Sequence, residues 1–308
     1  MNSLFFSSIV KGTLLFDRFE AVACLSATEV GAVYLVRDTH SGGKELALKI
    51  LSTANQNLTP ALIEALQHEM AIASAIDHPN VVRCNSFFQD HEYAAFTMEY
   101  FASGTLADEI EKHRRMPIKY VEKALSQLLS GLRAIHRVGV VHRDIKPENI
   151  LIDAAGNLKI SDFSISTLNA LSEAEASAHL IGTMNYLSPE YIERGEVDCR
   201  SDIYAIGVIG YELLTGKLPF QKETLLESLT ARVKFDPDAP NTLRKSCPRT
   251  LSDIVMKALK RNPSQRYKNA QEMLNALAVL RADNLIDSNL HNLVAAQKFG
   301  LQAETVRN

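Results

Sequence analysis

One short segment constrains the fold of this chain more than any other, because it places several chemically distinct polar side chains close together. It runs from His142 to Asn149 with the sequence HRDIKPEN, and Asp162 follows thirteen residues after Asn149, in the sequence DFS. The apolar run at 150–152 predicts a strand, so a hairpin can return Asp162 to the same loop. Asp144 offers a carboxylate that can accept a hydroxyl proton, while Asn149 and Asp162 offer oxygen atoms to a metal ion. This combination suits phosphoryl transfer, in which the protein positions the reactants and neutralises charge.

The composition predicts a folded chain with a large core. The 308 residues allow one large domain or two lobes that share a cleft, and 46% of them are hydrophobic. With 33 Lys and Arg against 36 Asp and Glu, the net charge is -3, so no nucleic-acid partner is expected. The cysteines are far apart and contain no Cys-x-x-Cys pair, which predicts reduced thiols instead of a zinc cluster or disulfides: Cys24, Cys84, Cys199 and Cys247.

The N-terminus does not resemble a targeting signal. Its apolar residues at 4–6 are followed by Ser7 and Ser8, and no basic residue precedes them. No window approaches the roughly 20 apolar residues that a membrane helix requires. We therefore expect a soluble, cytoplasmic protein without a membrane span.

The chain up to residue 99 is predicted to be mostly extended. Residue patterns predict strands over 19–25, 31–37, 44–51, 81–88 and 93–99. One helix interrupts them. It is expected to open at Thr59 and Pro60, a capping residue followed by a proline at the first helical position, and to run towards residue 76, before the sequence His-Pro-Asn at 78–80.

From residue 105 onwards the pattern becomes helical. An apolar stripe predicts one buried helix face: Val121, Leu125, Leu128, Leu129, Leu132 and Ile135. Further helices are expected over 201–214, 250–260 and 269–281, and Thr250 with Asp253 has capping-box spacing. Apolar residues within 286–294 also recur at helical spacing, which predicts an amphipathic helix that packs on its own domain or, alternatively, binds a partner. We therefore expect an α+β fold, with a cleft near 100–104 between a small sheet lobe and a larger helical lobe.

The ordered set of motifs resembles the eukaryotic-type (Hanks-type) Ser/Thr protein kinases, the bacterial members most closely. The resemblance implies a kinase domain over 16–281, with an N-lobe at 16–99, a hinge at 100–104 and a C-lobe at 105–281. Residues 1–15 then form an N-terminal extension and 282–308 a helical tail. It further implies ATP and Mg²⁺ (or Mn²⁺) as cofactors, protein substrates with Ser or Thr acceptors, and autophosphorylation, with a dimer as one route to phosphorylation in trans.

The resemblance also implies catalytic roles. Asp144 orients the acceptor hydroxyl and takes its proton, and Lys146 contacts the transferring phosphate. Lys49, in the strand sequence LALK, meets the nucleotide phosphates and is held there by Glu69, for which Glu64 is the less well spaced alternative. The two metal ions are held by two ligands of this sequence, Asn149 and Asp162.

The expected nucleotide site combines residues from several strands. Met98 would guard the back of the adenine pocket, and Glu99 and Phe101 would bond the base through their backbone. The ring would lie between apolar side chains: Val33, Ala47 and Leu151. A loop with the sequence LSATEVGAV would cover the phosphates, through four positions: Leu25, Ser26, Thr28 and Gly31.

This covering loop departs from the family pattern, because only Gly31 remains of the three glycines that let a backbone approach phosphates closely. We therefore expect weak ATP binding. Ser164 also replaces the glycine after Asp162 and Phe163. An active enzyme is favoured because every residue with an electrostatic role is present. The alternatives are a pseudokinase-like binding module and a small-molecule phosphotransferase, which normally lacks a segment such as 188–190.

Three further expectations concern structure and regulation. Glu190 is expected to form a buried pair with Arg266, Asp202 to brace the catalytic loop, and Thr183 to bond near Asp144. Arg143 precedes Asp144 as in kinases that are activated by phosphorylation, since a phosphate can match its guanidinium. The candidate phosphorylation sites are two serines of the segment between the motifs: Ser172 and Ser177.

Overall fold

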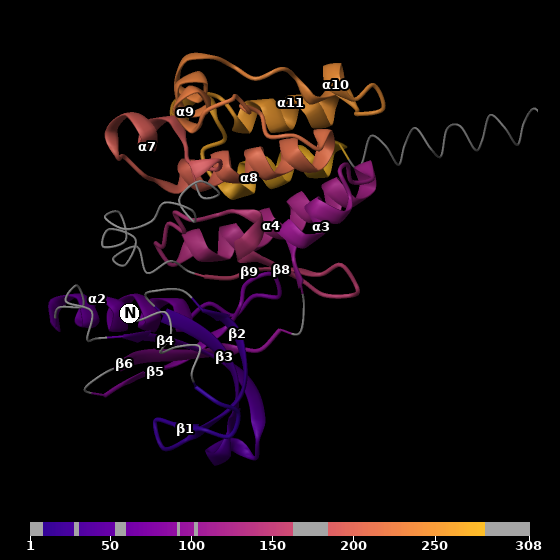
Figure 1. The fold of residues 1–308 in the computed structure, drawn as a ribbon. Helices are drawn as coiled ribbons and strands as arrows, with labels where there is room; N and C mark the ends of the chain where they lie inside the picture. Colours follow the sequence, from indigo (N-terminus) through magenta and orange to yellow (C-terminus); the bar gives the residue numbers. More distant parts are fainter. Residues whose placement is uncertain are drawn as a thin grey trace, which may run out of the picture.

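The computed structural model describes residues 9–27, 31–52, 60–90, 93–101, 104–162 and 184–280, with the backbone alone at 52, 60–62 and 69. Strands dominate the first half of this set and helices the second, and the two halves form separate lobes (Figure 1). The α+β, two-lobe prediction is confirmed. The expected helical tail after residue 281 lies outside the described residues.

The first lobe is a six-stranded antiparallel sheet in the order β1-β2-β3-β4-β6-β5, with helix α2 on one face. Alternate residues of β4 point to opposite faces, so Ala47 and Leu51 pack with Leu66 of α2 while Leu48 and Ile50 fill the other face. The elements are β1 (Leu14–Leu15), β2 (Phe19–Ala27), β3 (Gly31–Asp38), η1 (Thr39–Ser41), β4 (Lys44–Ser52), α2 (Pro60–Ser74), β5 (Cys84–Gln89) and β6 (Tyr93–Glu99).

Strand β5 begins at Cys84, so its predicted start at residue 81 was wrong. Val81 instead forms an isolated parallel bridge with Ile160 of the other lobe. The Ile160 backbone N–H also donates to the Asn80 carbonyl at 2.9 Å. Helix α4 comes close at Gly131, where a Cβ would lie 2.5 Å from the Asn80 carbonyl oxygen. This segment therefore ties the two lobes together, and only glycine permits the approach.

The second lobe is built around α4, whose predicted apolar stripe is fully buried. Helix α8 packs against α4, and a small antiparallel sheet, β7-β8-β9, lies on the side that faces the first lobe (Figure 1). The elements are β7 (Gly104–Thr105), α3 (Leu106–Lys112), α4 (Ile118–Arg137), η2 (Pro147–Asn149), β8 (Ile150–Ile152), β9 (Leu158–Ile160), α7 (Pro189–Arg194), α8 (Cys199–Thr215), α9 (Leu225–Lys234), α10 (Pro240–Leu243), α11 (Arg249–Ala258) and η3 (Pro263–Gln265).

Two helix starts near the C-terminus contrast with each other. Helix α11 begins at Arg249 after Pro248, without a side-chain cap, so the predicted capping box of Thr250 was wrong. The proline sets an earlier start and leaves Thr250 inside the first turn. Residues 270–280 are helical, and Asn269 Oδ1 accepts a hydrogen bond from the Glu272 backbone at 3.0 Å, which confirms the predicted start.

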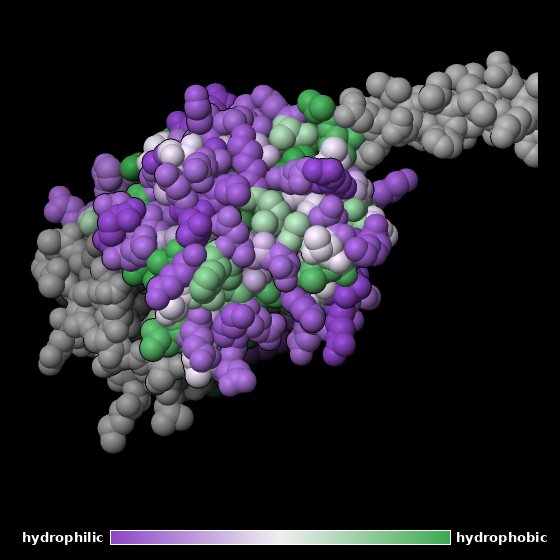
Figure 2. Space-filling view, turned by 90° about the horizontal axis from the view of Figure 1, so that it is seen from above, coloured by the Kyte–Doolittle hydropathy of each residue, from purple (hydrophilic) through white to green (hydrophobic). Residues whose placement is uncertain are grey.

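The surface of the helical lobe is mainly hydrophilic. Figure 2 shows apolar residues in small separate groups on the face seen from above. Across the ranges that the structure describes, every helix is too short or too polar to cross a bilayer.

Candidate active site

Asp144 lies in the loop between α4 and η2, where two neighbours contact its carboxylate. Asn149 Nδ2 donates to Asp144 Oδ2 and to the Asp144 carbonyl, both at 2.8 Å. Lys146 Nζ lies 2.9 Å from the same Oδ2. Since these bonds use the amide nitrogen of the buried Asn149, its amide oxygen is the atom that can face a cation. The loop therefore combines a carboxylate, an ammonium group and a potential metal ligand.

Helix α8 holds the backbone of this loop in a strained conformation. Arg143 has φ of 68°, a left-handed value that is costly for a residue with a Cβ. Asp202 accepts hydrogen bonds from the backbone N–H groups of His142 at 2.8 Å and Arg143 at 2.9 Å. The predicted bracing role of Asp202 is confirmed. Sequence reasoning missed His136, whose Nε2 donates to Asp202 at 2.8 Å from the last turn of α4.

The hairpin of β8 and β9 returns the chain to the catalytic loop. Both the backbone N–H and the hydroxyl of Ser161 donate to the Asn149 carbonyl, at 2.9 and 3.0 Å. His142 Nε2 donates to the Ser161 carbonyl at 3.0 Å. Asp162 comes next in the chain and has φ of 50°, a second strained residue beside the first. The hairpin thus places Asp162 close to Asn149 in the catalytic loop.

Lys49 reaches this place from the other lobe. Its Nζ in β4 lies 2.6 Å from Asp162 Oδ1, although 113 positions separate the two residues. The Lys49 ammonium group holds the pKa of the Asp162 carboxyl below its usual value, against the opposing effect of burial. The Glu69 side chain lies outside the described part, so its pair with Lys49 stays a prediction, while the alternative, Glu64, is exposed in α2.

The residues expected around adenine share one apolar cluster. Ala47 and Met98 are buried in it as direct neighbours on β4 and β6, and Val33 and Leu151 pack against it from opposite lobes. Cys84 belongs to the same cluster, and burial raises the pKa of its thiol to about 12, so it is an inert apolar residue here.

The hinge carries an ion pair that sequence reasoning missed. Lys159 Nζ of β9 lies 2.6 Å from Glu99 Oε1 of β6, and it sits 5.5 Å from the centre of the Phe101 ring. The Arg83 backbone N–H donates to the same carboxylate oxygen at 2.9 Å. The alternation of β9 predicts an outward Lys159, but nothing in the sequence identifies a partner sixty positions away.

The phosphate-covering loop is only partly described. Leu25 and Ser26 lie at the exposed end of β2. A Cβ at Gly31 would lie 2.4 Å from the Ile50 carbonyl oxygen, so the close approach of β4 alone requires this glycine. Other expected residues lie outside the described part of the chain: Thr28, Ser164, Ser172, Ser177 and Thr183.

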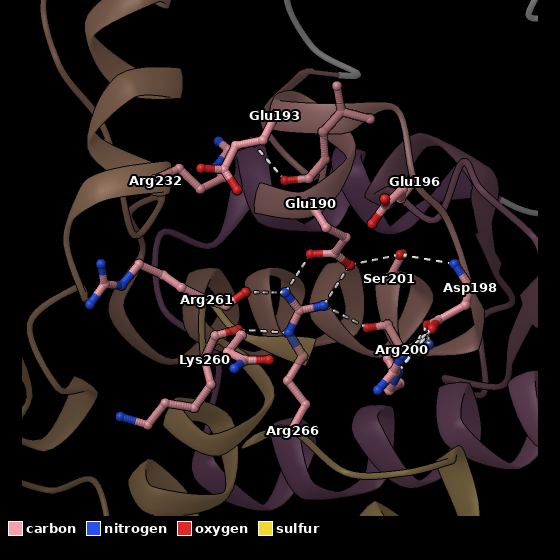
Figure 3. Close-up of polar contacts among 12 residues, drawn as sticks. Glu190, Glu193, Glu196, Asp198, Arg200, Ser201, Arg232, Lys260, Arg261 and Arg266 are labelled. Atoms are coloured by element: carbon pink, nitrogen blue, oxygen red, sulfur yellow. Dashed lines mark hydrogen bonds and ion pairs between the residues drawn. The ribbon is translucent and has the colours of Figure 1, made fainter. Parts of the chain in front are cut away.

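The predicted buried ion pair is confirmed. Arg266 contacts both carboxylate oxygens of Glu190, at 2.6 and 2.8 Å, and Ser201 Oγ donates to the same carboxylate at 2.8 Å (Figure 3). Burial opposes ionisation of Glu190, but the hydrogen bonds and charge of Arg266 outweigh it and lower the pKa of the carboxyl. This pair fixes α7 to the residue that directly follows η3.

Comparison with known proteins identifies the family. Residues 21–277 match the model of the protein kinase domain. The chain belongs to this family. It is 31% identical over 264 residues to the serine/threonine-protein kinase PrkC of Bacillus subtilis. This match covers 85% of the present chain and 40% of PrkC. The identity to the serine/threonine-protein kinase PknB of Mycobacterium leprae is 33% over 264 residues, or 84% of this chain and 42% of the relative. The chain thus spans about two fifths of the length of these relatives.

A protein kinase domain implies ATP and a divalent metal ion, and the residues present fit this requirement. Among the described residues, no group of three or more His, Cys, Asp and Glu side chains forms a metal site by itself. Mg²⁺ does not require such a group, because it usually binds one or two protein oxygen ligands together with phosphates and water. Asn149 and Asp162 supply oxygen donors of this kind.

Proposed function

We propose that this chain transfers the γ-phosphoryl group of ATP to Ser or Thr hydroxyls of proteins. One observation carries the proposal: Lys49 of the sheet lobe meets Asp162 of the helical lobe at 2.6 Å, beside the loop that holds Asp144. A triphosphate between the lobes would therefore meet an ammonium group, two metal ligands and a proton acceptor. The similarity to named Ser/Thr kinases supports the choice of acceptor.

Each side chain of the site has a distinct proposed role. Asp144 orients the acceptor hydroxyl and accepts its proton, and Lys146 neutralises charge on the group in transfer. Lys49 holds the nucleotide phosphates, while Asn149 and Asp162 hold Mg²⁺ or Mn²⁺. When bound, the metal ions neutralise phosphate charge. Positioning of the reactants and neutralisation of charge are the two main contributions to the rate of phosphoryl transfer.

The test is phosphorylation of a library of peptides with Ser, Thr or Tyr as the only acceptor, using ATP with a labelled γ-phosphate and Mg²⁺. We expect labelled Ser or Thr peptides and one ADP per phosphate transferred. Nucleotide binding without any transfer would support the alternative of a pseudokinase-like module. Transfer to small-molecule hydroxyls but to no peptide would refute the choice of substrate.

ATP is expected to bind weakly, because Ser26 and Thr28 stand where the family has glycines and Glu29 adds a like charge near the phosphates. We expect a dissociation constant on the order of 100 μM with Mg²⁺, measured by calorimetry. The paired change Ser26→Gly and Thr28→Gly should tighten binding severalfold. A wild-type constant of about 1 μM would contradict the expectation.

Activation is proposed to depend on phosphorylation of Ser172 or Ser177, because Arg143 is exposed beside Asp144 and can bind a phosphate. The double variant Ser172→Ala and Ser177→Ala should phosphorylate peptides severalfold more slowly than the wild type. Arg143→Gln alone should cause a similar loss, and adding Arg143→Gln to the double variant should cause no further loss. Ser74→Ala, at an exposed serine of α2, is the matched control. Unchanged activity of the double variant would exclude this switch.

A further inference from the structure

Helix α9 contains a buried arginine that has no acidic partner among the described residues. Arg232 is 1% exposed and is the largest of the fully buried side chains. Burial lowers the pKa of its guanidinium, and the ionisable groups that act on it are two tyrosines, Tyr204 and Tyr186. Within the described ranges its Nε has no hydrogen-bond partner. Such an arrangement is costly, because a buried ion normally needs a counter-ion or a full set of hydrogen bonds.

The guanidinium of Arg232 donates hydrogen bonds to one short segment. Its Nη1 donates to the carbonyl oxygen atoms of Met184 and Leu187, the latter at 3.0 Å. In Figure 3 the side chain extends from α9 towards α7, the helix that begins directly after this segment. We call residues 184–188 the docking segment. Arg232 therefore connects α9 with the docking segment at Met184 and at Leu187.

The docking segment lies against the catalytic loop. A cavity of about 30 Å³ is lined by Arg143 and Asp144 on one side and by Leu187 and Ser188 on the other. The hydroxyl group of Tyr186, in the middle of the segment, donates a hydrogen bond to Glu212 Oε2 of α8 at 2.7 Å. The docking segment therefore lines the same cavity as Asp144, which an acceptor hydroxyl must approach.

We propose that Arg232 is a positioning residue for the protein substrate: it fixes the docking segment so that the acceptor side chain meets Asp144. This inference rests on the proposed kinase function. A buried guanidinium carries a large desolvation cost, and among the described residues its hydrogen bonds go to the docking segment, which points to a role at that segment. A local cost of this kind is typical of a site that serves function.

The test compares steady-state kinetics of Arg232→Met and Arg232→Lys with the wild type, using a Ser peptide selected from the library described above. Arg232→Met should raise the KM for the peptide about tenfold, because two charge-assisted hydrogen bonds are lost. The kcat and the KM for ATP should change by less than about twofold. Arg232→Lys should be intermediate, since an ammonium group still donates to carbonyl oxygen atoms. Selectivity at the positions that flank the acceptor should weaken in Arg232→Met.

A second arginine provides the matched control. Arg261 Nη1 donates to the Lys234 carbonyl at the end of α9, at 2.9 Å, but its side chain is half exposed and contacts Asp236. Arg261→Met therefore perturbs the same helix without touching the docking segment. Its KM for the peptide should remain at the wild-type value.

The outcomes separate this inference from the proposed function. A wild type that transfers phosphate, with Arg232→Met at the wild-type peptide KM, overturns the inference alone. An equal loss of kcat for every substrate together with a lower melting temperature also overturns it, because that result indicates loss of folded protein. A wild type that transfers no phosphate to any peptide overturns the proposed function and this inference with it.

Discussion

Asp144→Asn is expected to lower kcat for peptide phosphorylation by about 10²–10⁴-fold, the usual contribution of a positioned proton acceptor. The amide has the shape of the carboxylate but cannot take the hydroxyl proton. It also removes the charge that Lys146 contacts at 2.9 Å. Steady-state assays with a Ser peptide give kcat, and calorimetry gives the affinity for ATP, which should be little changed because Asp144 is not assigned to the nucleotide.

Asp153→Asn is the control for this change. Asp153 lies in the exposed turn between β8 and β9, where its carboxylate accepts hydrogen bonds from Ala155 and Asn157. Its kcat should stay close to that of the wild type. An Asp144→Asn variant that retains most of the wild-type kcat would show that proton transfer and acceptor orientation lie elsewhere.

Glu190→Gln should be the most destabilising of the proposed changes, at about 3–5 kcal/mol, because it leaves Arg266 buried and unpaired. The guanidinium contacts both oxygen atoms of Glu190, and its side chain is fully buried. Urea unfolding measures the difference in free energy of unfolding. Glu193→Gln on the same helix removes an exposed pair with Arg194 at 3.3 Å and should cost less than about 1 kcal/mol. Equal effects of the two changes would contradict the assigned role.

The destabilisation by Glu190→Gln should depend on pH in a defined direction. The pKa of Glu190 is lower in the folded protein than in the unfolded chain, so its ionic contribution is present above the unfolded pKa and is lost as pH falls through the folded pKa. The difference between wild type and variant should therefore shrink on acidification. A difference that grows at low pH would contradict the assigned charge state.

Local sequence patterns predicted many elements of the fold, although α3, α7, α9 and α10 were not among the predicted helices. The stripe of α4 is set by a period of 3.6 residues, so its burial could be predicted from spacing alone. The start of β5 could not, because Val81 has the residue type of a strand but bridges to Ile160 in the other lobe. The predicted cap of α11 was wrong for a similar reason. Thr250 and Asp253 have capping-box spacing, but Pro248 sets an earlier start of the helix.

The candidate site also combines residues that the sequence predicted with interactions that it did not. Asp144, Asn149 and Asp162 were predictable because motif order constrains where they lie. The interactions that were missed all join distant segments, as Lys159 with Glu99 and His136 with Asp202 do. Arg232 escaped notice because a basic residue in an amphipathic helix predicts an exposed side chain. The cytoplasmic location, the dimer and the tail at 282–308 stay predictions.

The central claim is that side chains from both lobes converge on one triphosphate and its metal ions. The most direct measurement is a crystal structure with a non-hydrolysable ATP analogue and Mn²⁺, whose anomalous signal locates the metal. The account predicts metal bound to Asn149 and Asp162, phosphates beside Lys49, and adenine between Val33 and Leu151. Nucleotide bound at any other surface, or metal away from Asp162, would contradict it.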